Sequence, residues 1–129
     1  GHDTIVIKAL RVEAGTGVVP TASLTLAVDD QVKSVTVCGD GPVDAIFRAI
    51  REIYPHDATL QLFQINAVTE GTDAQATVSV RLEENGRTVT GKASDTDTMA
   101  AAAYAYVNAL NKLLVKREKL APEALTVAR

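Results

Sequence analysis

The sequence predicts an α+β domain made of two pseudo-symmetric βββα units, each an antiparallel three-stranded sheet with one helix. Three observations lead to this prediction. Segments in which apolar and polar residues alternate, the period of a half-buried strand, occur in two groups of three. Each group is followed by a segment whose apolar residues recur at helical spacing. The two groups align with one fixed offset, so residues about 3–55 and about 58–118 form the two units.

The first unit contains three strand signals. Residues 4–12 are β-branched and apolar, and residues 22–28 alternate apolar with polar side chains. The dipeptide Asp29-Asp30 is typical of a tight turn, and residues 32–38 follow it as the third strand. Short turns between successive strands predict that each strand pairs with the next in an antiparallel sheet.

A helix follows the third strand. Pro42 suits the first helical position, because the N–H that proline lacks would have no partner there. Pro55 ends the helix. The apolar residues at helical spacing between the two prolines are Val43, Ile46, Phe47, Ile50 and Tyr54.

The second unit repeats this pattern. Residues 60–68 form the fourth strand, and the phase of its apolar residues shifts near Phe63, which is typical of a β-bulge. Residues 76–83 alternate cleanly between apolar and polar side chains. The dipeptide Asn85-Gly86 is the strongest hairpin signal in the chain, and it predicts that residues 87–93 form the sixth strand.

A long helix over about residues 98–116 completes the second unit. Residues 94–97 supply side chains that cap a helix N-terminus. Pro122 is expected to break the helix, and residues 119–129 to form a flexible tail. The predicted apolar stripe consists of Met99, Ala103, Tyr106, Leu110 and Leu113.

The two units align at an offset of 55 residues. At this offset Asp40 matches Asp95, one helix approach against the other, and Asp30 matches Asn85, one turn against the other. Few residues are identical, so the repeat is one of architecture. A single helix does not cover all the apolar surface of a three-stranded sheet, so another element must bury the rest. We therefore expect the two units to pack about a pseudo-twofold axis, and a homodimer is consistent with the same need.

Composition excludes several classes of protein. The chain has 129 residues, enough for one domain, and 47% of them are apolar, enough for a core. A formal net charge of −3 argues against nucleic-acid binding, which relies on clustered lysine and arginine. No apolar stretch is long enough to span a bilayer. The single cysteine excludes a disulfide within the chain and favours a reducing compartment, the cytoplasm.

The first two residues, Gly1 and His2, are interpreted as the remnant of a cleaved expression tag. The native protein is then expected to continue upstream.

The chain offers no convincing catalytic group. His56 lies in a predicted loop and is expected to be solvated. Cys38 has no histidine placed to activate it and is expected to be a small buried hydrophobe. One histidine and one cysteine do not make a tetrahedral zinc site. We therefore expect this chain to be non-catalytic and to hold no cofactor.

The two predicted helix starts are the chemically interesting positions. Asp40 with Asp44, and Asp95 with Asp97, flank these starts and are suited to cap free N–H groups. A helix start can also receive a carboxylate, while a nearby aspartate pairs with an ammonium group. Two helix starts that face each other would hold an α-amino acid by both charged ends. The residue types leave both interpretations open.

Four segments resemble one family. Residues 39–47 resemble the GxGPVDA segment of the regulatory domain shared by 2-isopropylmalate and citramalate synthases. Residues 68–78 resemble its T.G.DA...V strand pair. Gly91 with residues 94–97 resembles its approach to the last helix, and residues 105–111 resemble its AY..ALN ending. The segments occur in the right order and cover about residues 4–116.

The resemblance implies a fold of two βββα units in a homodimer. It implies that the full-length enzyme joins acetyl-CoA to a 2-oxo acid in an upstream metal-dependent barrel, with a divalent metal there and none in this chain. It implies that this domain binds leucine, or isoleucine in citramalate synthases, and inhibits the distant active site. A dimerisation module without an effector remains an alternative.

By position, the resemblance also assigns two effector-binding segments. The first comprises Gly39, Asp40, Gly41, Pro42, Asp44 and Ala45, and the second comprises Asp95, Thr96, Asp97 and Ala100. The segment Asp97-Thr98-Met99 stands where many relatives carry an aspartate followed by isoleucine or valine, so the shape of the side-chain pocket, and with it the choice of effector, stays open.

Overall fold

The computed structural model describes residues 4–67 and 74–127, with side chains described to residue 116. The presumed tag remnant, Gly1 and His2, lies outside the described residues, as do residues 68–73 of the second resembling segment. The interpretation of the first two residues therefore stays a prediction, as do the limits of the two units and the flexibility assigned to residues 119–129.

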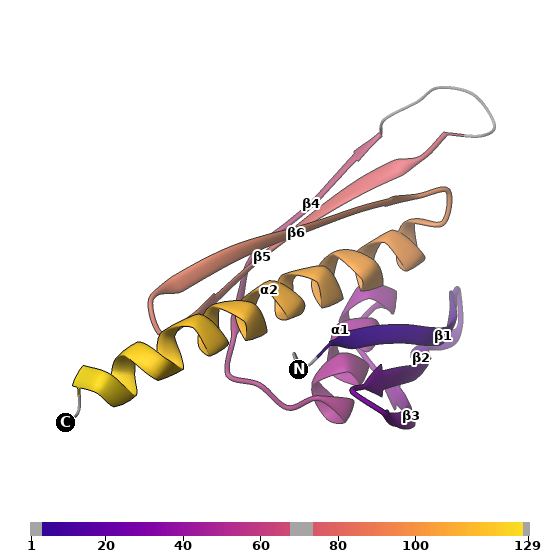
Figure 1. The fold of residues 1–129 in the computed structure, drawn as a ribbon. Coiled ribbons are helices and arrows are strands. Elements are labelled where there is room, and N and C mark those ends of the chain that lie inside the picture. The colour runs from indigo at the N-terminus through magenta and orange to yellow at the C-terminus, as the bar shows by residue number, and fades with distance from the viewer. Residues whose placement is uncertain (1–3, 68–73, 128–129) are drawn as a thin grey trace.

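The predicted fold class is confirmed: two antiparallel three-stranded sheets are each followed by a helix (Figure 1). The strand orders are β1-β2-β3 and β4-β5-β6, so every strand pairs with its neighbour in sequence. The first unit comprises β1 (Ile5–Gly15), β2 (Val18–Val28), β3 (Gln31–Cys38) and α1 (Pro42–Ile53). The second comprises β4 (Thr59–Ala67), β5 (Ala76–Glu84), β6 (Arg87–Asp95) and α2 (Thr98–Val127).

The repeat is real, but its offset in the second half of each unit is 56 residues rather than 55. The turn residues with positive φ, Asp29 and Asn85, are 56 positions apart, as are the first helical residues, Pro42 and Thr98. Gly41 therefore matches Asp97, and both precede a helix directly. The predicted pairing of Asp40 with Asp95 is wrong by one residue, because sequence identity between the units is too low to fix the register.

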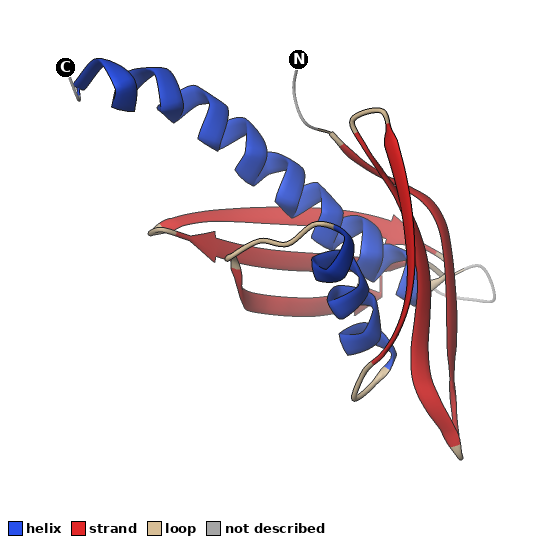
Figure 2. Cartoon of the chain, turned by 90° about the horizontal axis from the view of Figure 1, so that it is seen from below, coloured by secondary structure: helices blue, strands red, loops and turns tan. Residues whose placement is uncertain are grey.

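Both helices lie between the two sheets (Figure 2). Helix α1 packs on β2 and β3, whereas α2 packs on β5 and β6 and also touches β1 and α1. The inward face of β2 carries Ala22, Leu24 and Leu26, each at most 1% exposed. Burial of such apolar faces is the main favourable term in folding. One core therefore joins the two units.

Helix α2 runs further than predicted. It continues to Val127, so the prediction that it ends near Lys116 and breaks at Pro122 is wrong. Proline inside a helix costs about 3 kcal/mol. Lysine, glutamate, leucine and alanine, all strong helix formers, surround Pro122 in sequence, and they favour continuation of the helix on both sides.

Register shifts interrupt both edge strands β1 and β4, one of them near the end of β1 between Glu13 and Gly15. The bulge predicted near Phe63 is present, as a shift of register between Leu60 and Leu62. A second, unpredicted bulge lies between Ile7 and Ala9 of β1. It allows Ile7 and Leu10, which strict alternation would put on opposite faces, to pair with Leu26 and Leu24 on the inward face.

Candidate functional site

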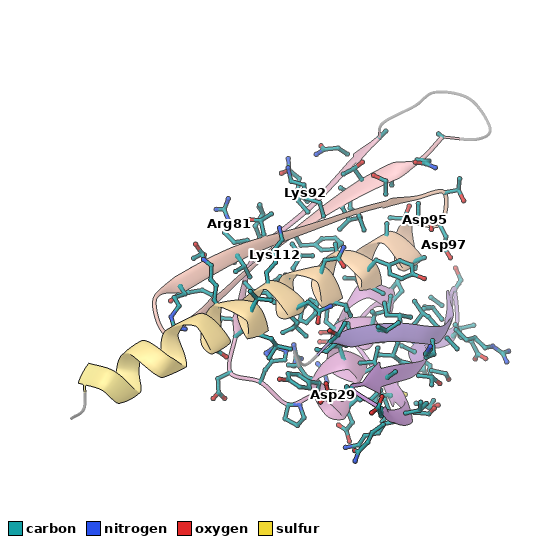
Figure 3. All side chains as sticks on the ribbon, in the orientation of Figure 1. Asp29, Arg81, Lys92, Asp95, Asp97 and Lys112 are labelled. Carbon is teal, nitrogen blue, oxygen red and sulfur yellow. The ribbon has the colours of Figure 1, made fainter. Side chains whose placement is uncertain are left out.

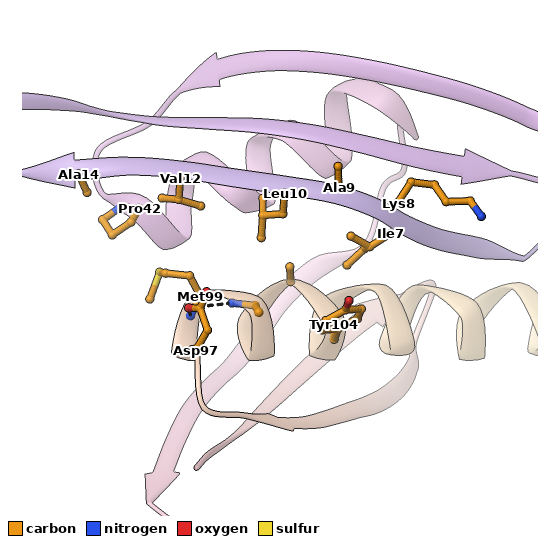
Figure 4. A pocket seen from close by; sticks show the side chains of 12 residues that line it. Ile7, Lys8, Ala9, Leu10, Val12, Ala14, Pro42, Asp97, Met99 and Tyr104 are labelled. Atoms are coloured by element: carbon orange, nitrogen blue, oxygen red, sulfur yellow. Dashed lines mark hydrogen bonds between the residues drawn. The ribbon is translucent and has the colours of Figure 1, made fainter. Parts of the chain in front are cut away.

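A pocket of about 570 Å³ lies between β1 and the first turns of α2 (Figure 4). This volume is within the range of about 300–1,000 Å³ that is typical of small-molecule sites. Most of its lining is apolar. The apolar side chains come from both elements and include Ile7, Leu10, Val12, Met99, Ala100 and Ala103.

Charged and polar groups stand at different places along this pocket. Figure 4 shows Asp97 at one end, close to Pro42 and Met99, with Lys8 toward the other end. Tyr104 adds a hydroxyl from α2 and is 44% exposed. The pocket is therefore apolar between Asp97 at one end and the exposed Lys8 at the other.

The N-terminus of α2 is capped by its own side chains. Oδ1 of Asp97 accepts hydrogen bonds from the backbone N–H groups of Met99 (2.9 Å) and Ala100 (3.4 Å). The N–H of Asp97 in turn donates to Oδ1 of Asp95 at 2.8 Å. Of the residues 94–97 predicted to cap the helix, Asp97 is confirmed as the cap, whereas the Ser94 hydroxyl pairs with that of Thr77 on β5. These donors are occupied, so this helix tip presents a carboxylate to the pocket rather than free N–H groups.

The N-terminus of α1 differs. Gly41 is the residue before the helix and makes no side-chain cap, and Pro42 occupies the first turn. The N–H groups of Val43 and Asp44 fall in the first turn, where no intrahelical acceptor exists. Gly41 has φ of −159°, an extended conformation that any residue adopts, and a Cβ there would meet no atom within 4 Å. This tip is therefore open to an anion.

The two acidic residues near α1 are tied to each other and to Arg48. Oδ2 of Asp44 accepts hydrogen bonds from the Asp40 N–H at 2.8 Å and from Nε of Arg48 at 2.7 Å. Arg48 also reaches Oδ2 of Asp40 at 3.4 Å. This small network folds the loop back onto α1 and accounts for both aspartates structurally.

Of the ten predicted site residues, three line the pocket: Pro42, Asp97 and Ala100. Ala45 lies in the core at 0% exposure. Gly39 is needed for packing, because a Cβ there would overlap the backbone of Ala45. The seven that do not line it are Gly39, Asp40, Gly41, Asp44, Ala45, Asp95 and Thr96.

Sequence reasoning missed the contribution of β1. Ile7, Lys8 and Leu10 line the pocket only because the β1 bulge turns this strand toward α2. The signal for it was present: apolar residues in the first strand occur at 5 and 7 and then at 10 and 12, a slip of one position. Tyr104 was also missed, since it lies off the predicted apolar stripe.

The two residues weighed as nucleophile or base are both placed differently from expectation. His56 is half-buried rather than simply solvated: its Nδ1 accepts from the Ala58 N–H at 3.2 Å, and its Nε2 lies 3.0 Å from the Tyr106 hydroxyl. Cys38 is exposed rather than buried. Neither lines the pocket. Burial raises the pKa of Tyr106 above its ordinary value of 10.0, and a hydrogen bond and the charge of Arg51 oppose this shift.

Among residues 4–67 and 74–116, no group of three histidine, cysteine or acidic side chains is arranged to hold a metal ion. Neither α1 nor the described part of α2 combines the length and hydropathy that a membrane-spanning helix requires.

Comparison with known proteins identifies clear relatives. Residues 1–114 match the model of the LeuA allosteric (dimerisation) domain. The chain is 61% identical over 124 residues to a 2-isopropylmalate synthase of Caulobacter sp. (strain K31), a match that covers 96% of this chain and 24% of the relative. It is 51% identical over 118 residues to the 2-isopropylmalate synthase of Bradyrhizobium diazoefficiens, covering 92% and 23%. The chain thus spans about a quarter of the length of these relatives.

Proposed function

The chain belongs to the family of LeuA allosteric (dimerisation) domains, and on that premise we propose that it is the regulatory domain of a 2-isopropylmalate synthase that binds leucine. In this proposal the full-length protein transfers the acetyl group of acetyl-CoA to a 2-oxo acid in an upstream, metal-dependent domain in the cytoplasm. Leucine, the end product, inhibits that reaction from this domain. The names of the relatives support leucine as the effector.

The observation that carries the proposal is that the two helix starts meet at one end of an apolar pocket. Pro42 begins α1 and Asp97 precedes α2, and both line the same pocket (Figure 4). The carboxylate of the effector would lie at the open tip of α1, where N–H groups and the positive end of the helix dipole favour an anion. Its ammonium would pair with Asp97.

The remaining lining suits a branched aliphatic side chain. Leu10, Met99 and Ala103 present only carbon and sulfur to the pocket. Burial of an aliphatic side chain there contributes about 25 cal/mol for each Å² removed from water. The small Ala100 and Ala103 leave space along α2 that larger residues would fill. Isoleucine has the same number of carbons, and it is the alternative effector, as in citramalate synthases.

A dimerisation module without effector binding is the second candidate. One observation favours it: Asp97 already caps α2, so one of the two helix tips has its donors occupied. In that case the pocket would be part of an interface with a second copy of this chain, and no amino acid would bind.

Isothermal titration calorimetry with L-leucine, and separately with L-isoleucine, distinguishes these candidates. We predict saturable binding of leucine that Asp97→Asn weakens about tenfold, since the neutral side chain loses the pair with the ammonium group. Asparagine caps a helix as well as aspartate does, so the fold is retained. Asp30→Asn, an equal change of charge outside the pocket, is the matched control and should bind as the wild type does.

Each outcome of these titrations favours or contradicts one candidate. Tighter binding of isoleucine than of leucine favours the alternative effector. No heat with either amino acid, in a chain whose circular dichroism spectrum shows a folded protein, favours the dimerisation module. Equal affinity of the wild type and Asp97→Asn would contradict the assignment of the ammonium to Asp97.

A further inference from the structure

Strand β6 is an edge of the second sheet and should expose a row of backbone groups. Glu84 pairs with Arg87 across a two-residue turn, so residues 87, 89 and 91 are the ones that bond to β5. The alternate residues, Thr88, Thr90 and Lys92, therefore direct their N–H and C=O groups outward. An edge of this kind is a template on which another strand can add.

Helix α2 covers the outward carbonyl groups of this edge. Nδ2 of Asn108 donates to the carbonyl of Lys92 at 2.9 Å. Nζ of Lys112 donates to the carbonyl of Thr90 at 2.6 Å, and Nζ of Lys116 donates to that of Thr88 at 3.2 Å. Figure 3 shows Lys112 between α2 and β6.

The spacing of these three donors fits the strand. They stand four residues apart on α2, which corresponds to a rise of about 6 Å per step. The carbonyls stand two residues apart on β6, or about 6.8 Å per step. Each turn of the helix thus brings one donor to one outward carbonyl, and the long lysine side chains take up the difference.

We propose that Asn108, Lys112 and Lys116 form an edge cap that prevents a strand of a second copy of this chain from adding to β6. The occupant follows from the sequence: the uncapped edge would carry Thr88, Val89 and Thr90, β-branched residues that favour strand pairing. The best complement available in a solution of the pure protein is the same strand of another copy. The cap directs self-association to surfaces other than β6.

Net charge does not explain the cap. The chain carries a formal net charge of −3, and replacing two lysines by alanine makes it −5. Copies that carry more like charge repel each other more strongly. A gain in association after removal of the lysines is therefore not explained by net charge.

The test is sedimentation velocity on the variant Asn108→Ala/Lys112→Ala/Lys116→Ala. At equal concentration we expect its weight-average mass to be at least twice that of the wild type. In the associated species we expect amide hydrogen exchange at Thr88, Thr90 and Lys92 to slow at least about tenfold, because these outward N–H groups become paired.

Two controls test whether the uncapped edge of β6 causes the association. Lys112→Arg/Lys116→Arg keeps both donors and both charges, and it should sediment as the wild type does. Thr90→Pro added to the triple variant removes an outward N–H that β5 does not use, and it should return the mass to the wild-type value. A triple variant with the wild-type mass, or one whose association survives Thr90→Pro, overturns the proposal. If the triple variant lacks a folded circular dichroism spectrum, Lys112→Ala/Lys116→Ala decides by the same readouts.

Discussion

Gly91 is a residue at which a single methyl group is expected to disrupt the fold. A Cβ on Gly91 would overlap the carbonyl oxygen of Ala105 and the backbone nitrogen of Ala109, and it would lie 3.0 Å from the Cα of Ala109. Helix α2 packs on β6 at this distance because both surfaces are small: Ala105 and Ala109 are themselves fully buried. The close approach of α2 to β6 thus depends on Gly91 of β6 and on Ala105 and Ala109 of α2.

We predict that Gly91→Ala destabilises the chain by about 2–3 kcal/mol, since backbone atoms must move to admit the methyl group. The midpoint of urea unfolding should fall accordingly. Gly41→Ser is the control, because a Cβ at Gly41 meets no atom within 4 Å, and serine suits the position before a helix. Unchanged stability of Gly91→Ala would show that α2 does not pack this closely on β6.

Tyr106 gives the stability a dependence on alkaline pH. Burial raises the pKa of this tyrosine in the folded state above the value in the unfolded chain, and Arg51 partly opposes the shift. A raised pKa means that the folded state keeps its proton where the unfolded state loses it. The contribution is therefore complete below pH 10 and is lost as pH rises through the folded-state pKa.

We predict that the free energy of unfolding falls as pH rises above about 10 and that Tyr106→Phe reduces this fall. The variant loses the contact of the hydroxyl with His56, which costs about 1 kcal/mol at neutral pH. Urea unfolding of both proteins across this range provides the comparison. If the free energy of unfolding fell equally with pH in the wild type and in Tyr106→Phe, the hydroxyl of Tyr106 would have the same pKa in the folded and unfolded states.

At the scale of the element, the sequence predicted strands and helices well because their periods of two and 3.6 are local properties. Asn85-Gly86 located the second hairpin, and residues 94–97 located the cap of α2. The features that depend on contacts between elements were missed. The bulge that brings Ile7 and Leu10 to one face is stabilised by their pairing with β2 and by the core below it.

The candidate site was predicted in part for the same reason. Asp97 and Pro42 mark helix starts, which sequence signals identify, so both were found. The wall opposite α2 comes from β1, almost 100 residues away in sequence, and no local pattern indicates that these segments meet. Cys38 and His56 were misplaced because exposure depends on which neighbours cover a residue.

The open N-terminus of α1 carries its own prediction. Gly41→Asp should fold, because φ of −159° and free space accommodate the side chain. Its carboxylate would occupy the N–H groups proposed to receive the effector and would repel the incoming anion, so leucine affinity should fall at least about tenfold.

Gly41→Asn separates the two effects in the same calorimetric titration. It caps the helix equally well but carries no charge, so its affinity should lie between those of the wild type and Gly41→Asp. Wild-type affinity in Gly41→Asp would remove the tip of α1 from the proposed site.

At the scale of the whole molecule, Asn111 links the two units by a pair of hydrogen bonds. The amide of Asn111 on α2 makes two hydrogen bonds to Ile5 on β1: Oδ1 accepts from its N–H at 2.8 Å, and Nδ2 donates to its carbonyl at 3.0 Å. The Asn111 amide thus makes with Ile5 the two backbone hydrogen bonds that a neighbouring strand would make at this point of β1. This pair of hydrogen bonds, here called the clamp, lies two residues from Ile7, which lines the pocket.

We predict that Asn111→Ala destabilises the chain by about 1–3 kcal/mol, since it leaves the backbone groups of a buried residue, Ile5, without these partners. Exchange of the Ile5 amide proton should accelerate by more than the global loss of stability explains. Asn108→Ala, a change of the same type on the exposed side of α2, is the control and should leave the Ile5 amide unaffected. Equal Ile5 exchange rates in all three proteins would contradict the clamp.

The central claim is that an amino acid binds between β1 and α2, with its charged ends at two helix starts. The most direct measurement is a ¹H–¹⁵N correlation spectrum of the labelled chain during titration with L-leucine. We predict saturable shifts concentrated at Ile7, Leu10, Val43, Met99 and Ala100, the amides that surround the pocket and the open tip of α1. Shifts confined to other surfaces, or none at saturating L-leucine, would contradict the claim.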